Sequence, residues 1–499
     1  MVGATLPRAA AALLLLAAAA SSQPSAHPCT WATFPAGTPS HTWPDGPHLG
    51  DGNQGLVIGG APGEVTIYGT VHGFWGASFG ANASMPPLVG ASPLGFPGCP
   101  SQNCSITVGL TLARVMIAAP QLGGAGATWN ATLDIAAGTA TVDLRSGSAG
   151  LRLVLLQHAT AAVGLLTLAN TGSVPLSPLN VTLAGNGNIR NVTLVPGCGL
   201  GAPGGACPAL PSGGAAGLPP PLSLTKDANA PGIASPLPIQ GAAGLAPLGY
   251  TGAPGTTLAV LPYAATEPAG DWARGGAQVP TLTAGLTLQL ALPPGSTAAF
   301  ATAMAASNDP GVTPGTPLAA VAARLAPVAL GDLPALARSH AAWWATFYAA
   351  SSVSLQGEAP TEAFFWSTLY ALGSGTRAGQ PVMDLWSPWR TTDYSAWRSN
   401  PTMDYNQVRR RSAGCRVAAF TRAAPEAYLP TPHAPPPPLP PTRSKRCTAA
   451  CTPSTTWSWR SPTMTFCPRP WPAAAPRWRL PRWAAPRAST SAWTWRPLA

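Results

Sequence analysis

The chain has 499 residues with 54 Gly, 60 Pro and only 9% charged residues, a composition that favours loop-rich β structure and argues against a helical bundle. The formal net charge of +11 is unevenly placed, because residues 408–499 hold 15 Lys and Arg against one acid, while residues 1–407 hold 12 basic and 15 acidic residues. The whole-chain charge therefore gives no reason to expect a nucleic-acid or anionic-membrane partner.

Residues 1–25 have the pattern of a secretory signal peptide. Arg8 gives the positive start, residues 9–20 are apolar, and small residues follow. The apolar run is shorter than the roughly 20 residues that a membrane-spanning helix needs, so we expect a secreted, extracellular product without a membrane anchor. Five N-x-[ST] sequons agree with export and are candidate glycosylation sites: Asn82, Asn103, Asn130, Asn180 and Asn191.

The nine cysteines also fit an oxidising compartment. Two close pairs in Gly/Pro-rich segments are disulfide candidates, Cys99 with Cys104 and Cys198 with Cys207. Zinc ligation by these four is the weaker alternative, because no His or CxxC spacing supports it. We expect no metal and no cofactor.

Residues 26–310 read as a large antiparallel β-sandwich. A glycine-rich turn in 43–60 feeds an apolar strand, and many β-prone runs then follow without intervening helices up to about residue 303. Several runs alternate, so that Ile106, Val108, Leu110 and Leu112 share one face. The Gly/Pro-rich segment 196–255 is predicted to be a surface insertion with little structure of its own.

The spacing of apolar residues then changes from every second residue to every third or fourth, and residues 311–355 are predicted to be a helical linker. One helix is expected over 316–350, with Asp332 as a plausible N-cap and Pro334 in the first turn. His340 lies on its apolar face, where a hydrogen-bonded core histidine is the expected role in preference to a ligand. A second helix is expected from Thr361, with Phe365, Leu369 and Leu372 as its apolar stripe.

Residues 383–407 follow as a long loop rich in Trp, Tyr and Asp. Flat rings stack on the C–H faces of sugars, and carboxylates and amides bind their hydroxyls, so this mixture suits a carbohydrate site. The alternative is a plain loop with core aromatics and solvated carboxylates.

The composition changes sharply at residue 408. The remaining 92 residues hold one of the 54 Gly and seven of the 18 Trp, and they contain no Ile, Asp or Asn. Such a segment cannot bury a core, so it is predicted to be disordered. It could be a basic-aromatic arm, a Pro-rich wall-protein extension, or an out-of-frame reading of a GC-rich gene, and only the last explains the loss of glycine and aliphatic residues.

Three segments resemble glycoside hydrolase family 95, a group of six-hairpin glycosidases. Residues 43–60 are similar to the glycine-rich entry of its N-terminal sandwich, and residues 290–355 are similar to its sandwich end and helical linker. Residues 361–407 resemble the first helix and first active-site loop of an (α/α)6 barrel. The resemblance implies that 356–407 is the start of such a barrel.

Family 95 enzymes are inverting exo-glycosidases that act on α-L-fucosides or α-L-galactosides. The resemblance assigns water positioning to Asp404 and Asn406, although Asp404 departs from the Asn found there in the family. It assigns substrate binding in the sugar site to the following residues: Trp389, Asp393, Trp397 and Gln407.

Inversion requires a carboxylic acid and a carboxylate base on opposite faces of the sugar. In the family both lie beyond the matched segment, and the only carboxylate after residue 407 is Glu426. We therefore expect a secreted glycosidase-like protein with an oligosaccharide or polysaccharide substrate, disrupted after Gln407 and inactive as given.

The rival is a non-catalytic glycan-binding or wall-associated glycoprotein. A nucleic-acid-binding protein, suggested by 408–499 alone, is disfavoured by the acidic body and the export signal.

Overall fold

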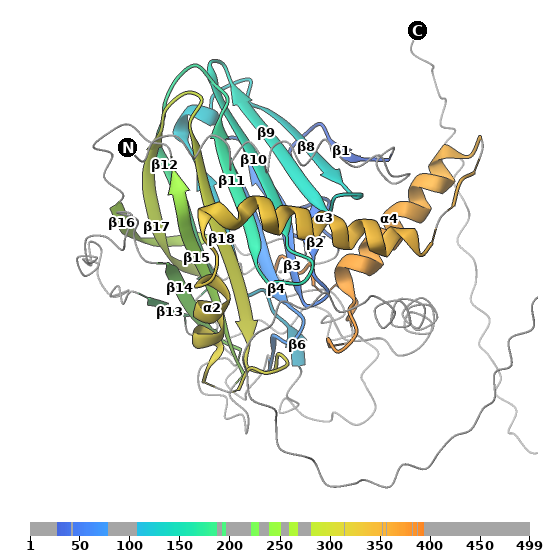
Figure 1. Ribbon diagram of the computed structural model, residues 1–499. Coiled ribbons are helices and arrows are strands. Elements are labelled where there is room, and N and C mark those ends of the chain that lie inside the picture. The colour runs from blue at the N-terminus through green and yellow to red at the C-terminus, as the bar shows by residue number, and fades with distance from the viewer. Residues whose placement is uncertain are drawn as a thin grey trace, which may run out of the picture. The chain divides into compact units, whose positions relative to one another are not determined.

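The computed structural model describes residues within 27–393 and all of them lie in the first of the two units into which the chain divides, Met1–Ala427. The described ranges are 27–40, 43–77, 107–186, 192–195, 221–228, 239–250, 259–267, 281–313, 315–351, 353–355, 357–381, 383–386 and 388–393. They form two large antiparallel sheets followed by helices (Figure 1), which confirms the predicted fold class of a β-sandwich with a partial helical region. The predicted disorder of 408–499 lies outside the described residues.

In the described chain the larger sheet has nine strands. In spatial order they are β1 (Cys29–Trp31), β8 (Thr128–Asp134), β9 (Thr139–Ser146), β10 (Ala149–Gln157), β11 (Gly164–Asn170), β18 (Thr297–Ala306), β15 (Gln240–Tyr250), β14 (Leu222–Asp227) and β13 (Val192–Val195). The second sheet has seven: β16 (Ala259–Glu267), β17 (Thr281–Leu292), β12 (Leu176–Asn186), β7 (Ala113–Ala118), β4 (Glu64–Val71), β3 (Gln54–Ala61) and β2 (His48–Gly50). A short pair, β5 (Trp75–Ala77) with β6 (Thr107–Gly109), completes the described strands.

The middle of the nine-stranded sheet is buried on both faces. Along β10, Leu151, Leu153 and Leu155 belong to the large core between the sheets, whereas Val154 and Leu156 belong to a second cluster on the opposite face. This alternation follows from the two-residue period of a strand. The second cluster also contains residues of the two helices that follow the sandwich, so those helices cover the outer face.

The prediction for 196–255 was wrong where the structure describes that segment. It contains β14 and β15, and β15 pairs with β14 on one side and β18 on the other. Glycine and alanine in β15 permit close helix packing: a Cβ at Gly244 would lie 2.6 Å from Val321 and 2.7 Å from Leu325. Small residues that suggested a loop are therefore the contact surface of a central strand.

The single helix expected over 316–350 is two helices, α2 (Pro317–Leu325) and α3 (Leu333–Ala349), joined through the 3-10 turn η3 (Leu330–Asp332). Pro327 explains the break, because proline lacks the N–H that a helix needs and clashes with the preceding turn. Asp332 is the N-cap residue of α3, as predicted, but its side chain makes no capping hydrogen bond; its Oδ2 accepts the Ala329 N–H at 2.9 Å instead. Another 3-10 turn, η2 (Pro120–Leu122), precedes β8.

The second predicted helix is α4 (Ala359–Gly375), which begins before Thr361. Its buried face is offset by one residue from the predicted stripe, because Trp366 and Tyr370 are buried while Phe365 and Leu369 are half-buried. Tyr370 stacks on Trp344 of α3 with ring centroids 5.0 Å apart. The helix is apolar on several sides, so its sequence alone did not select the face that packs on α3.

Within the described chain, no single helix combines the length and hydropathy needed to cross a bilayer, and only the α2 and η3–α3 pieces together, bent by 68°, pass that test.

Candidate functional site

Two of the segments that carry the family resemblance, 43–60 and 361–407, meet at a junction held by hydrogen bonds to backbone carbonyls. The Tyr370 hydroxyl donates to the carbonyl of His48 at 2.9 Å, and the Gly52 N–H donates to the carbonyl of Ser374 at 2.7 Å. The indole N–H of Trp389 donates to the carbonyl of Leu49 at 2.9 Å. The β2–β3 turn is thus held to the end of α4 and to the loop after it.

Glycine is required in this turn because backbone approaches backbone. A Cβ at Gly50 would lie 2.5 Å from the carbonyl oxygen of Ser374, and one at Gly55 would lie 2.1 Å from that of Pro388. Gly52 has φ of +89°, a left-handed conformation that favours glycine. The sequence predicted the glycine-rich turn and the strand after it, but the glycines also make room for segments more than 300 residues later.

Buried ion pairs fix the described part of the 383–407 loop. Asp393 accepts two hydrogen bonds from Lys226 Nζ at 2.8 and 3.0 Å, and two from the N–H and hydroxyl of Thr111 at 3.0 and 2.7 Å. Arg390 pairs with Asp384 and donates through Nη2 to the carbonyl of Val71 at 3.0 Å. Burial lowers the pKa of Arg390 from its ordinary value, with Asp384 opposing that shift.

Two of the predicted sugar-site residues can be placed. Trp389 is fully buried, and Asp393 is buried against β14 and the 110–112 segment. Their hydrogen bonds described above are made to protein groups, so these contacts anchor the loop, and contact of either residue with a sugar stays a prediction. The other site residues, Trp397, Asp404, Asn406 and Gln407, lie outside the described residues.

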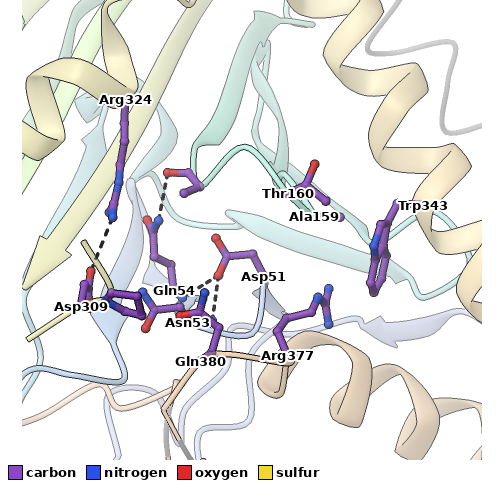
Figure 2. Close-up of a pocket in the computed structure, with 12 residues that line it drawn as sticks. Asp51, Asn53, Gln54, Ala159, Thr160, Asp309, Arg324, Trp343, Arg377 and Gln380 are labelled. Atoms are coloured by element: carbon purple, nitrogen blue, oxygen red, sulfur yellow. Dashed lines mark hydrogen bonds and ion pairs between the residues drawn. The ribbon is translucent and has the colours of Figure 1, made fainter. Parts of the chain in front are cut away.

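A polar pocket of about 260 Å³ lies at the same junction (Figure 2). It was not predicted from the sequence, and all three resembling segments line it. The β2–β3 turn, the β10–β11 loop, the segment after β18, helices α2 and α3, and the residues after α4 each contribute to the lining: Asp51, Asn53, Gln54, Ala159, Thr160, Ala162, Asp309, Pro310, Arg324, Trp343, Arg377 and Gln380. The sequence feature that could have indicated this pocket is the set of polar residues bracketed by Gly50, Gly52 and Gly55.

One acidic residue of the pocket holds the turn. Asp51 Oδ1 accepts the N–H groups of Asn53 and Gln54 at 2.9 and 2.7 Å, and its Oδ2 accepts from Gln157 at 2.9 Å. Burial raises the pKa of Asp51, an effect opposed by these hydrogen bonds and by Arg377. Both carboxylate oxygens are therefore engaged in shaping the site.

The second acidic residue is only partly engaged. Asp309 Oδ2 accepts the Ala306 N–H at 3.1 Å and lies 3.6 Å from Arg324 Nη2. Burial raises the pKa of this carboxyl as well, with the Ala306 hydrogen bond, Arg324 and the side chain of Asn53 acting against the shift. Asp309 Oδ1 has no hydrogen-bonding partner among the described residues.

Other polar atoms of the lining are also unpartnered within the described chain. They are the side-chain oxygens of Asn53 and Gln380 and two guanidinium nitrogens of Arg377, Nε and Nη2. The Arg377 guanidinium lies 3.8 Å from the centre of the Trp343 ring, and burial lowers its pKa to about 10, so it stays charged at neutral pH. Buried polar atoms are normally paired, so these donors and acceptors are available to bind a ligand or water that enters the pocket.

His340 is the core histidine that the sequence predicted. Its Nδ1 accepts the Ala159 N–H at 3.1 Å, and its Nε2 lies 3.1 Å from the carbonyl of Gly138. These two bonds require neutral imidazole with the proton on Nε2. Burial, reinforced by His158, lowers the pKa of His340 to about 4.

This pKa predicts an acid sensitivity. The unfolded histidine titrates near pH 6.5, so between about pH 6.5 and 4 the unfolded chain binds the extra proton and the free energy of unfolding falls as the pH falls. The contribution present above pH 6.5 and lost by pH 4 is roughly 3 kcal/mol. Denaturant unfolding at a series of pH values from 7 to 4.5 measures how the free energy of unfolding depends on pH. The slope of that dependence should be smaller in His340→Gln than in the wild-type protein, by up to about 1.4 kcal/mol per pH unit. Equal slopes in both proteins would contradict the assignment.

The export-related residues are partly described. Asn130 is exposed on β8, and Asn180 is half-buried on β12, where its Oδ1 accepts from Gln289 at 3.2 Å. Both stay predicted glycosylation sites. The sequons at Asn82, Asn103 and Asn191 and the four cysteines of the predicted disulfides lie outside the described residues.

The described residues contain no cluster of three or more His, Cys, Asp or Glu that could hold a metal ion.

No known protein-family model matches the chain, and no curated protein matches it. The chain is similar in structure to a kojibiose phosphorylase from the human microbiome, at 10% sequence identity and a TM-score of 0.40, over 71% of this chain and 42% of that one. It is also similar to a family GH92 α-mannosidase from Bacteroides thetaiotaomicron, at 10% identity and a TM-score of 0.26, over 71% and 41% of the two chains. A mannoimidazole complex of that enzyme gives 8% identity, a TM-score of 0.25, and 68% and 38% coverage. The chain thus spans about two fifths of the length of these proteins.

Proposed function

We propose that this chain is a secreted glycoside-hydrolase-like protein that recognises α-L-fucosides or α-L-galactosides, as its resemblance to family 95 implies. The observation that carries the proposal is the meeting of the three resembling segments, which lie far apart in the sequence and together line one polar pocket. The lining combines many polar side chains with the ring of Trp343, and sugars are bound by hydrogen bonds to such polar groups and by contact with a flat ring.

A second candidate, a non-catalytic glycan-binding protein, is favoured by the state of the pocket carboxylates. Asp51 has both oxygens engaged by the protein, and Asp309 has one oxygen engaged. An inverting glycosidase needs one carboxyl free to donate a proton and another free to activate water. Among the pocket carboxylates, only Asp309 has an oxygen, Oδ1, without a hydrogen-bonding partner in the described chain. The pocket therefore offers one such group where inversion needs two.

The test is a binding titration and a turnover assay on the same preparation of the full chain. We expect saturable binding of L-fucose or L-galactose, insensitive to salt, because the contacts are hydrogen bonds and not counterion exchange. Incubation with nitrophenyl α-L-fucoside, followed by detection of the anomer released, separates the two candidates: inverted fucose as first product identifies the hydrolase, and binding without product identifies the glycan-binding protein. Absence of binding to either sugar would overturn the proposal in both forms.

A further inference from the structure

The unpartnered atoms in the pocket of Figure 2 are of both hydrogen-bonding kinds. Three are acceptors, the oxygens Asn53 Oδ1, Asp309 Oδ1 and Gln380 Oε1, and two are donors, Nε and Nη2 of Arg377. Asn53 and Asp309 are themselves more than nine-tenths buried. A ligand that satisfies this set must therefore donate and accept within a small volume.

The pocket lining carries two acidic and two basic side chains, so their charges balance. Asp309 lies beside Arg324, and the positive charge of Arg377 acts on Asp51. An anionic ligand could accept from Arg377, but it would leave the three acceptors unsatisfied and would approach two carboxylates in a site of low dielectric. A cationic ligand would leave the Arg377 donors unsatisfied and would approach a second cation.

Hydroxyl groups meet both requirements, because each one donates and accepts. Several hydroxyls on one ring could bond to Asp309, Asn53 and Gln380 through their hydrogens and to Arg377 through their oxygens. The pocket volume of about 260 Å³ lies just below the range usual for drug-sized ligands, which suits a single sugar ring. The half-buried Trp343, whose ring lies under the Arg377 guanidinium, lines the pocket and adds an aromatic wall.

We propose that this pocket binds one uncharged cyclic polyol of monosaccharide size and discriminates against sugar acids. The inference rests on the proposed function in taking the ligand to be a sugar, and it adds the site, the size and the charge of the group that is bound. Arg377 and Asp309 set the specificity: Arg377 supplies the donors, and Asp309 supplies an acceptor and repels carboxylates.

The experiment is titration calorimetry on the full chain with L-fucose, myo-inositol, and the matched pair D-galactose and D-galacturonate, which differ in a carboxylate at C6. We expect the neutral ligands to bind, and D-galactose to bind more than tenfold tighter than D-galacturonate. Arg377→Lys keeps the charge but loses the paired guanidinium donors, and it should weaken binding of neutral sugars about tenfold, as the loss of one to two hydrogen bonds predicts. The matched control is Arg338→Lys, since Arg338 lies exposed on α3 and does not line the pocket.

A specificity variant keeps the test decisive if Arg377→Lys does not fold. Asp309→Asn has the same shape without the charge, and it should reduce the preference for D-galactose over D-galacturonate about tenfold. Sugar binding that neither pocket variant changes would overturn this inference and leave the proposed function standing. Tighter binding of D-galacturonate than of D-galactose would overturn the charge assignment alone, and failure of every sugar to bind would overturn the proposed function itself.

Discussion

Lys226→Met is expected to lower the free energy of unfolding by about 3–5 kcal/mol. The Lys226 and Asp393 side chains are 1% and 4% exposed, and their charged atoms lie 2.8 Å apart. The substitution fills the space of the lysine chain but leaves the Asp393 carboxylate buried without the ammonium beside it. An uncompensated buried charge costs far more than the ion pair contributes by itself.

A double-mutant cycle separates this effect from simple loss of packing. Lys226→Met combined with Asp393→Leu removes both charges, so its cost should be smaller than that of Lys226→Met alone, with a residual of about 1–3 kcal/mol because the Thr111 N–H and hydroxyl lose their acceptor. Arg152→Met is the matched control in the partly exposed Arg152–Asp143 pair and should cost at most about 1 kcal/mol. Chemical denaturation of the wild-type protein, Lys226→Met, Asp393→Leu, their combination and Arg152→Met gives the values. A Lys226→Met cost no larger than that of Arg152→Met would contradict the predicted role of the buried pair.

The same ion pair shows what the sequence could and could not indicate. Asp393 stood out because it lies in a loop rich in aromatic residues, and this location predicted contact with a sugar. Its observed partner, Lys226, lies 167 residues earlier, in a segment whose Gly/Pro composition predicted a surface insertion. Composition reports local preference, whereas this contact depends on which strands pair across the sheet. The residue was therefore singled out, and its partner was not.

The sheets themselves were accessible from the sequence because strand alternation is local. The run 106–117 was recognised from its two-residue period, although the structure divides it into β6 and β7 around residues 110–112. The break between α2 and α3 was also readable in principle, since Pro327 lies at that point. The pocket was not readable, because its lining comes from the β2–β3 turn, from α3 and from the residues after α4, and only the folded chain brings these together.

Gly55→Ala is expected to be strongly destabilising, because the added methyl group would overlap the backbone of a distant segment at the junction. A Cβ at this position would lie 2.1 Å from the carbonyl oxygen of Pro388 and 2.6 Å from its carbonyl carbon. Both atoms belong to backbone, so no side-chain rotation relieves the overlap, and either β3 or the 388–393 segment must move. Overpacking of a well-packed site costs about 1–3 kcal/mol, and displacement of the Trp389 hydrogen bond to Leu49 should bring the loss to the upper end of that range.

The control is Gly331→Ala in η3, where an added Cβ meets no atom within 4 Å and the backbone is not left-handed. Its effect should be within about 0.5 kcal/mol of zero, or slightly stabilising, because alanine restricts the unfolded chain more than glycine does. Trp389 lies at the displaced contact, so its fluorescence in the native baseline should change in Gly55→Ala and not in Gly331→Ala. If Gly55→Ala unfolds at the same denaturant concentration as Gly331→Ala, the close approach of β3 to the 388–393 segment is absent in solution, and the anchoring of this loop to the sandwich must be abandoned.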